Sequence, residues 1–308
     1  MRYLVTGGAG FIGSNLVDAL LESGHEVLVL DDLSTGRRDN VATRAELIVA
    51  EVSDEAAVRG AVEGCDVVFH QAAHRAVLRS VEDPLATDTA NVHGTLTVLH
   101  AAQAAGVRRV VYASSSSVYG GAAQRPTPES AALIPRSPYA VTKLTGEHYC
   151  RVFSELHGLE TVALRYFNAF GPRQRPDSMY AAVIPLFIDA LRTGRRPVVH
   201  GDGLQSRDFT FIADVVAANI AAAGAPASDA SGRAYNIACG GEHSLIDLLG
   251  HLAEIIGTTV DAEHIAPRMG DVRHSCADVS AAARDLGWKA TTGFRDGLEA
   301  TVASAMSA

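Results

Sequence analysis

Short apolar runs rich in Val, Ile and Leu alternate along the chain with amphipathic stretches. The apolar runs predict strands at Tyr3–Thr6, Glu26–Leu30, Leu47–Ala50, Val67–His70, Arg109–Ala113, Thr161–Tyr166 and Ala234–Ile237, with another near Val198. Helical periodicity predicts helices at Gly13–Ser23, Ala90–Ala105, Tyr180–Thr193, Ala213–Ala223 and Ser244–Ile256. Most strand runs lack clean alternation, so both of their faces are expected to be buried. The pattern therefore predicts an α/β fold with a doubly wound parallel sheet.

After Phe167 the regular alternation of predicted strands and helices gives way to segments rich in turn residues, which indicates a second, smaller lobe. Turn residues predict a loop at Gly171–Asp177, and Ala225–Ser231 is predicted to be a surface loop. We expect residues 1–168 to form the main domain, with the chain returning to it at 212–238. Residues 169–211 and 239–308 are then expected to form a smaller α/β lobe that binds the substrate.

A glycine-rich loop joins the first predicted strand to the first predicted helix. Gly7 and Gly10 permit a tight turn and close approach of a pyrophosphate, and Gly13 lets the helix pack on the sheet. The free N–H groups and the dipole of the helix N-terminus attract phosphate. Asp31 ends the second strand, where a carboxylate accepts both ribose hydroxyls and repels a 2′-phosphate. The loop therefore predicts a Rossmann domain that binds NAD, although Arg37 and Arg38 leave NADP as an alternative.

A tyrosine and a lysine follow at helical spacing. Tyr139 and Lys143 share one helix face at i, i+4, behind Pro138 as a helix start. A nearby ammonium favours the tyrosinate, which makes Tyr139 a usable general base. A strand that ends in Ser114–Ser117 offers a hydroxyl where ligands bind in open α/β sheets.

Composition excludes several other classes of protein. The 308 residues carry a formal net charge of −9 and no cluster of Lys or Arg, so a nucleic-acid partner is not expected. The longest apolar runs are too short to cross a bilayer, and no metal-ligand spacing is present. The four cysteines are far apart, which favours buried, reduced thiols in a cytoplasmic protein.

Together with further motifs, the glycine loop and the Tyr–Lys pair make the chain resemble the extended short-chain dehydrogenase/reductase family, and within it the UDP-sugar 4-epimerases. The motifs are His70–Ala73, Asn91, Ser114–Gly120, Arg165–Asn168, Gly201–Gly203, Ser206–Phe209 and Arg268–Arg273. The resemblance implies that Ser115, Tyr139 and Lys143 are catalytic. It also implies NAD-binding roles for Gly7, Gly10, Phe11, Ile12, Gly13, Asp31, Asp32, Ser34, Thr35, Gly36, Glu51, Val52, Gln71, Ala72, Ala73, Arg75, Asn91, Ser114, Tyr139, Lys143, Tyr166 and Asn168.

The same resemblance implies a site for a UDP-sugar. Its residues would be Val77, Ser115, Ser116, Ser117, Tyr139, Asn168, Arg175, Ala182, Val183, Val199, His200, Gln205, Arg207, Arg268, Asp271 and Ser275. Arg207 and Arg268 match arginines on the diphosphate, a role that suits the guanidinium group. The family reaction is inversion at C4 through a 4-keto sugar, with the hydride taken up and returned by NAD.

Departures from related enzymes narrow the activity. In nucleotide-sugar dehydratases an Asp-Glu pair follows the catalytic hydroxyl residue, whereas here Ser116 and Ser117 follow it, which argues for simple epimerisation. In the family that this chain resembles, the position of Ser275 limits the space at the C2 substituent, and a small residue there implies room for an N-acetyl group. We therefore expect UDP-Glc/UDP-Gal and also UDP-GlcNAc/UDP-GalNAc as substrates. Arg175 resembles an arginine of uronic-acid epimerases, so UDP-glucuronate stays an alternative, as does a decarboxylase.

Two further expectations follow from the family. The helices around Ala90–Ala105 and Tyr139–Leu156 resemble those of a four-helix dimer interface, which predicts a homodimer. A regulatory protein that senses NAD is the alternative from another class, but such proteins often lose the Tyr–Lys pair that this chain keeps.

Overall fold

The computed structural model describes residues 1–75, 77–122, 124–176, 182–267 and 272–307. Within these residues a seven-stranded sheet has the order β11-β6-β5-β4-β1-β2-β3, and every neighbouring pair is parallel. Its strands are β1 (Arg2–Thr6), β2 (Glu26–Asp31), β3 (Glu46–Val49), β4 (Val67–His70), β5 (Arg109–Ser115), β6 (Glu160–Tyr166) and β11 (Arg233–Ile237). The predicted doubly wound parallel sheet is confirmed.

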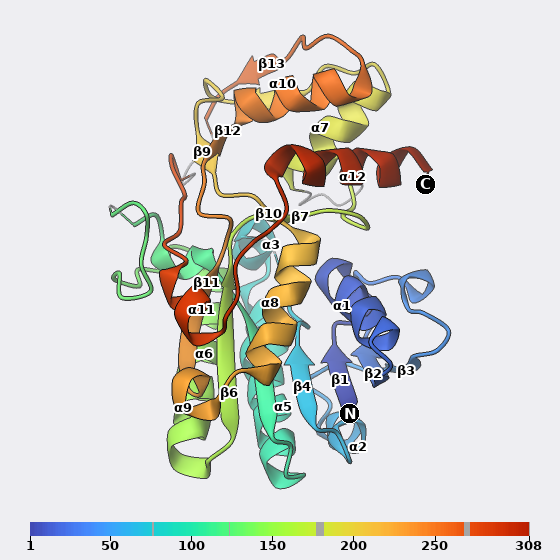
Figure 1. The fold of residues 1–308 in the computed structure, drawn as a ribbon, viewed down its shortest axis with the longest axis vertical. Helices are drawn as coiled ribbons and strands as arrows, with labels where there is room; N and C mark the ends of the chain where they lie inside the picture. The colour runs from blue at the N-terminus through green and yellow to red at the C-terminus, as the bar shows by residue number, and fades with distance from the viewer. Residues whose placement is uncertain (76, 123, 177–181, 268–271, 308) are drawn as a thin grey trace.

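Helices cover both faces of this sheet, as Figure 1 shows. The elements before the lobe are α1 (Phe11–Glu22), α2 (Glu55–Val62), α3 (Val77–Glu82), α4 (Pro84–Asp88), α5 (Gly94–Ala104) and α6 (Pro138–His157), with short turns η1 (Arg38–Asn40), η2 (Thr89–His93) and η3 (Ser116–Tyr119). Later come α8 (Ile212–Gly224), α9 (Ala227–Ala230) and α11 (Ser280–Asp285). Tyr3 and Val5 point into a core with α1 and α8, whereas Leu4 points into one with α2 and α5. Burial on both faces explains the unbroken apolar runs.

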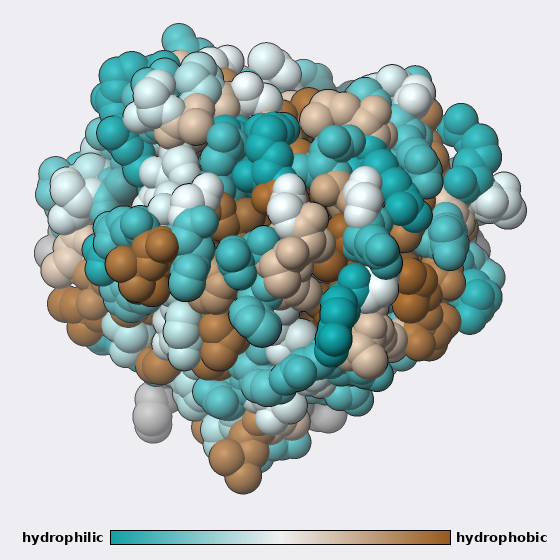
Figure 2. Space-filling model, turned by 90° about the horizontal axis from the view of Figure 1, so that it is seen from below, coloured by the Kyte–Doolittle hydropathy of each residue, from teal (hydrophilic) through white to brown (hydrophobic). Residues whose placement is uncertain are grey.

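A smaller lobe lies beyond the carboxyl ends of the strands (Figure 1). Its helices are α7 (Val183–Arg192), α10 (Leu245–Ile256) and α12 (Phe294–Ser307), which bury a separate apolar cluster. Three two-stranded ribbons complete it: β7 (Ala169–Phe170) with β10 (Thr210–Phe211), β8 (Val198–His200) with β13 (Glu263–Ile265), and β9 (Ser206–Arg207) with β12 (His243–Ser244). The opposite face, viewed in Figure 2 from the amino ends of the strands, mixes hydrophobic and hydrophilic side chains.

Several local predictions need correction. The predicted loop at Ala225–Ser231 contains the short helix α9, and the predicted helix at Ala90–Ala105 begins as a π-helical turn before α5. Cys239 is exposed, whereas the other three free cysteines are buried as expected. The fifth strand runs on to Ser115, because Ser114 and Ser115 continue the pairing with β6. No described helix is long and apolar enough to cross a membrane.

Candidate active site

The glycine loop forms the floor of a cavity of about 260 Å³, here called the loop cavity. Gly7 has a φ of +69°, and a Cβ there would lie 2.7 Å from the backbone N of Ala72, so only glycine fits. A Cβ on Gly13 would collide with the carbonyl of Gly7. The N-cap residue Gly10 offers no side chain to the first N–H groups of α1, which leaves them to a phosphate.

Asp31 lies at the end of β2 in the wall of the loop cavity. Its carboxylate accepts hydrogen bonds from the backbone N–H groups of Ala9 (2.9 Å) and Leu33 (2.8 Å), which fix its orientation. Burial raises the pKa of this carboxyl, and the two backbone hydrogen bonds lower it. The guanidinium of Arg37 is exposed and pairs with Asp39 at 3.5 Å. Arg37 and Arg38 do not line the loop cavity, so the geometry favours NAD.

Most of the predicted NAD-binding residues line this cavity. They are Gly7, Gly10, Phe11, Ile12, Gly13, Asp31, Asp32, Ser34, Thr35, Val52, Gln71, Ala72, Ala73 and Arg75. Others lie outside its wall. Asn91 is buried and accepts a hydrogen bond from the N–H of His74 while donating to Thr142, and exposed Glu51 accepts one from Ser53. Gly36 stands where a Cβ would press on the Asp31 carboxylate.

The three predicted catalytic residues come together at the carboxyl end of β5. Ser115 is the last residue of β5, and Tyr139 and Lys143 lie on the first turns of α6, which packs on β5 and β6. Ser137 caps α6 by accepting a hydrogen bond from the N–H of Ala140, and Pro138 is its first residue. These features explain why α6 begins immediately before Tyr139.

The Tyr139 hydroxyl is held by groups on both sides. Burial raises its pKa, while a hydrogen bond with Ser115 and the charge of Arg75 lower it. Besides Lys143, whose Nζ lies 5.9 Å from the Tyr139 ring, Arg75 of the loop cavity acts on this hydroxyl. A general base that contacts a serine hydroxyl and a cation is suited to exchange a proton with a sugar hydroxyl.

Lys143 is buried and directed at the strand. Its Nζ donates to the carbonyl of Ala113 at 2.8 Å and lies 5.9 Å from the centre of the Tyr139 ring. Burial lowers the pKa of Lys143 to about 7, against the opposing effect of Cys150 and Glu147. A lysine with so low a pKa beside a tyrosine is typical of a catalytic site.

A second cavity of about 410 Å³, the lobe cavity, is lined by residues of the smaller lobe together with Asn168. The two cavities share Ala169 and Gln174, so they adjoin. Of the predicted substrate-binding residues, Asn168, Ala182, Val183, His200, Gln205 and Arg207 line the lobe cavity, and Arg175 lines the loop cavity. Val77, Ser115, Ser116, Ser117, Tyr139 and Ser275 line neither cavity, and Val199 is fully buried in the lobe core. Arg268 and Asp271 lie outside the described residues.

Buried polar atoms without a hydrogen-bond partner among the described residues mark the same region. They include His74 Nδ1 and Gln174 Oε1 at the loop cavity, Gln205 Oε1 at the lobe cavity, and Ser117 Oγ beside Ser115. Because buried polar atoms are almost always paired, these atoms fit polar ligands in both cavities. With the glycine loop and Asp31, the residues present fit a dinucleotide.

Sequence reasoning missed several wall residues. His74, Arg173 and Gln174 line the loop cavity, and Phe187, Arg195 and Arg196 line the lobe cavity. Phe187 could have been found from the apolar periodicity of α7. The two arginines give no such signal, because Arg195 pairs with Asp189 and Arg196 with Asp261, as ordinary surface residues do.

Comparisons with known proteins agree with this geometry. Residues 3–238 match the model of the NAD dependent epimerase/dehydratase family. The chain belongs to this family. Membership confirms the predictions of an epimerase-type enzyme and of NAD as its cofactor.

Similar proteins cover the whole chain. A UDP-glucose 4-epimerase of Mycolicibacterium smegmatis is 41% identical over 98% of this chain and 97% of its own length. The structure of Thermotoga maritima UDP-glucose 4-epimerase with UDP-glucose matches with a TM-score of 0.96 and 34% identity, covering 100% and 99% of the two chains. A UDP-N-acetylglucosamine 4-epimerase from Methanobrevibacter ruminantium, in complex with UDP-N-acetylmuramic acid, matches with a TM-score of 0.95 and 37% identity, covering 99% and 98%.

Proposed function

We propose that this enzyme inverts C4 of a UDP-hexose through a 4-keto intermediate, acting on UDP-Glc/UDP-Gal and on UDP-GlcNAc/UDP-GalNAc. The observation that carries the proposal is the cluster of Ser115, Tyr139 and Lys143 at the carboxyl end of β5, where the charge of Arg75 from the loop cavity acts on Tyr139. The relatives named for 4-epimerisation of UDP-glucose and UDP-N-acetylglucosamine support the substrate class.

The residues divide the chemistry as follows. Tyr139 takes the proton of the C4 hydroxyl and later returns it, and Ser115 donates a hydrogen bond to the same oxygen. The glycine loop, Asp31 and Lys143 would hold NAD, which when bound would supply a reversible acceptor for the C4 hydride. Arg75 favours the tyrosinate. Because the diphosphate stays bound to the lobe, the 4-keto sugar would be free to turn and present the other face of C4.

The lobe cavity is proposed to hold the UDP group. Arg207 and His200 line it, together with Asn168, whose side chain donates to the carbonyl of Asp208 at 3.1 Å. Guanidinium groups suit a diphosphate because they bind its oxygens in pairs. In this proposal residues 1–168 and 212–238 hold NAD, and residues 169–211 and 239–308, including Arg268 and Asp271, hold the nucleotide sugar.

A panel of substrates tests the proposal. UDP-Gal, UDP-GalNAc and UDP-GlcA are each incubated with the NAD-loaded enzyme, and the products are identified by NMR and mass spectrometry. We expect products of unchanged mass and inverted C4 from the first two. A product lighter by water or by carbon dioxide would replace the proposal with a dehydratase or a decarboxylase.

UDP-glucuronate is the second candidate substrate, and one observation favours it. Arg175 lines the loop cavity and lies near enough to Arg75 to lower the pKa of that guanidinium, after the larger effect of burial. Two cations so close together suit a substrate carboxylate. Turnover of UDP-GlcA alone would favour this candidate over the neutral hexoses.

We also propose that the enzyme is a cytoplasmic homodimer. The apolar side chains of α5, such as Val98 and Leu99, are buried inside the subunit. Exposed apolar side chains lie instead on neighbouring α3, α4 and α6, including Val81, Leu85 and Leu156. Exposed apolar side chains on neighbouring helices support this proposal, because large exposed apolar patches mark interaction sites. Light scattering should give twice the subunit mass, and Leu85→Asp with Leu156→Asp should give the monomer.

A further inference from the structure

A buried ion pair lies next to the catalytic groups without forming the wall of either site cavity. Glu147 of α6 follows Lys143 by one helical turn, and Arg165 belongs to β6. Their side chains are only 6% and 5% exposed. Arg165 donates from Nε to one carboxylate oxygen at 2.9 Å and from Nη2 to the other at 2.7 Å. This bidentate geometry fixes the carboxylate of Glu147 in one orientation.

The same carboxylate ties α6 to the end of β5. Ser114 Oγ donates a hydrogen bond to Glu147 Oε1. In the chain Ser114 stands between Ala113, whose carbonyl accepts from Lys143 Nζ, and Ser115, which bonds with Tyr139. Glu147 therefore holds the strand residue whose two neighbours contact the catalytic lysine and tyrosine.

Arg165 extends the restraint to the turn after β5. Its Nη1 donates to Tyr119 Oη at 2.8 Å and to the carbonyl of Glu129 at 3.1 Å. Tyr119 closes the turn η3 that begins directly after Ser115. The ion pair thus restrains the backbone on both sides of Ser115.

Glu147 also acts on Lys143 electrostatically. The titratable groups around the Lys143 ammonium are Tyr139, Glu147 and Cys150 on α6, with Tyr112 on β5 and His70 on β4. Burial lowers the pKa of Lys143 to about 7, and Cys150 and Glu147 raise it. With Arg165 as its partner, Glu147 carries a negative charge that favours the ammonium form.

We propose that Glu147 is a positioning residue of the epimerase: its carboxylate holds the end of β5 in register with α6 and supplies negative charge to Lys143. This inference rests on the proposed function, because its effect is read from epimerase turnover. Glu147 lines neither the loop cavity nor the lobe cavity, so its removal should leave binding of the UDP-sugar unchanged.

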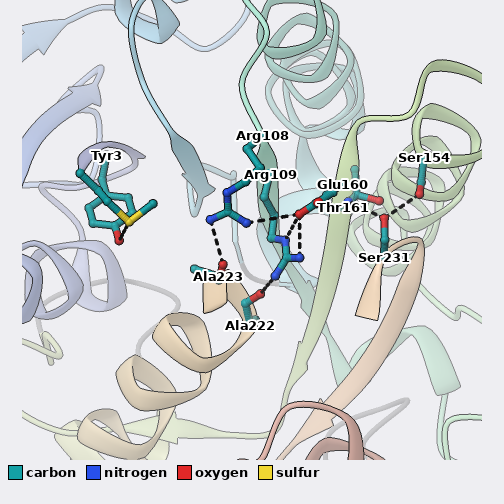
Figure 3. A network of polar contacts seen from close by, with 10 residues as sticks. Tyr3, Arg108, Arg109, Ser154, Glu160, Thr161, Ala222, Ala223 and Ser231 are labelled. Atoms are coloured by element: carbon teal, nitrogen blue, oxygen red, sulfur yellow. Dashed lines mark hydrogen bonds and ion pairs between the residues drawn. The ribbon is translucent and has the colours of Figure 1, made fainter. Parts of the chain in front are cut away.

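A matched ion pair at the other end of the same strands provides the control, as Figure 3 shows. Arg109 of β5 is 1% exposed at its side chain and binds Glu160 of β6 at 2.7 Å. Arg109 Nη1 also donates to the carbonyl of Ala222 at 2.7 Å. Glu160→Gln therefore removes a carboxylate from a buried arginine at the opposite end of the same sheet strands, far from Lys143.

The experiment compares Glu147→Gln, Glu147→Asp and Glu160→Gln with the wild type, by kcat, KM and the pH profile of UDP-Gal turnover. Gln keeps the shape but removes the charge, so the pKa of Lys143 falls and the alkaline limb of the pH profile should move to lower pH. We expect kcat to fall about tenfold to a hundredfold with KM within about twofold. Asp keeps the charge but is too short to reach both Ser114 and Arg165. In that variant kcat should therefore fall, while the alkaline limb of the pH profile stays in place. Glu160→Gln should change neither.

Each outcome decides the question. Wild-type kcat in Glu147→Gln, or an alkaline limb that stays in place, overturns the inference alone. The same holds if Glu160→Gln lowers kcat as much as Glu147→Gln. If Glu147→Gln does not fold, Glu147→Asp tests the inference instead, and a wild-type kcat in that variant overturns it. An inactive wild type overturns the proposed function and, with it, this inference.

Discussion

Two ion pairs with buried arginines lie at opposite ends of β5 and β6. At the amino end, Arg109 binds Glu160, whose side chain is 25% exposed and also pairs with Arg108 at 3.3 Å (Figure 3). At the carboxyl end, both Arg165 and Glu147 are buried. The chemical groups are the same, but the second pair lies beside Lys143, whose pKa burial lowers to about 7.

The carboxyl end differs because burial there disfavours the charged forms of the titratable side chains. Burial lowers the pKa of Lys143 to about 7 and that of His70 to about 3, and it raises the pKa of Tyr139. Desolvation of this kind costs stability and is retained where chemistry needs it. The amino end contributes stability, and the carboxyl end gives some of it up for reactivity.

The largest effect is expected at the carboxyl end from Tyr139→Phe. Loss of the general base should lower kcat by about 10²- to 10⁴-fold, while calorimetric binding of UDP-sugar is retained. Tyr235→Phe is the control, since that hydroxyl donates to the carbonyl of Asp229 at 2.8 Å, away from both cavities. Near wild-type turnover in Tyr139→Phe would remove the assigned base.

The two arginines should differ in their contribution to stability. Arg165→Met leaves Glu147 buried without a counter-charge and should cost about 3–5 kcal/mol of unfolding free energy. Arg109→Met should cost less, about 2 kcal/mol, because Glu160 keeps Arg108 and contact with water. Urea unfolding of both variants measures the difference. A larger loss in Arg109→Met would reverse our ranking of the two ends.

His70 should make the protein sensitive to acid. Its imidazole lies between Thr6 Oγ1 at 2.7 Å and Thr95 Oγ1 at 3.0 Å, and burial lowers its pKa from 6.5 to about 3. Between these values the unfolded chain binds the proton and the folded chain does not, so stability is present above pH 6.5 and is lost as pH falls. The loss should reach about 2 kcal/mol at pH 5.

Unfolding free energies at pH 7 and pH 5 measure this effect. His70→Gln should remove most of the loss of unfolding free energy between pH 7 and pH 5, whereas His100→Gln, at an exposed position, should keep it. An equal slope in the wild type and in His70→Gln would show that other groups govern the acid response.

The smallest effect is expected from Arg108→Ala at the amino end. Its side chain is 42% exposed, and it contacts Glu160 at 3.3 Å and the carbonyl of Ala223 at 3.2 Å. Water replaces such contacts readily, so the unfolding free energy should fall by about 0.5 kcal/mol. If this variant lost as much stability as Arg109→Met, burial would not be what distinguishes the two arginines.

Features that depend on short sequence spacing were predicted from the chain. The glycine loop, Asp31 at the end of β2 and the i, i+4 pair Tyr139 and Lys143 each follow from one element and its immediate neighbour. The element types were predictable for the same reason, because burial on both faces leaves continuous apolar runs. Local details failed where no pattern carries a signal, as with the short helix α9 and the exposed Cys239.

Contacts between distant segments were decided by the tertiary structure. The charge of Arg75 reaches Tyr139, Glu147 meets Arg165 and Ser114, and Gln174 belongs to both cavities only because the parallel strands end at one edge under the smaller lobe. The sequence by itself determined the cofactor loop and the reactive pair, since neighbours along one element are fixed by its geometry. The charges and unpaired polar atoms around that pair were decided by packing. A pKa and a cavity wall both depend on all the groups that exclude water from the site, and these come from distant parts of the chain.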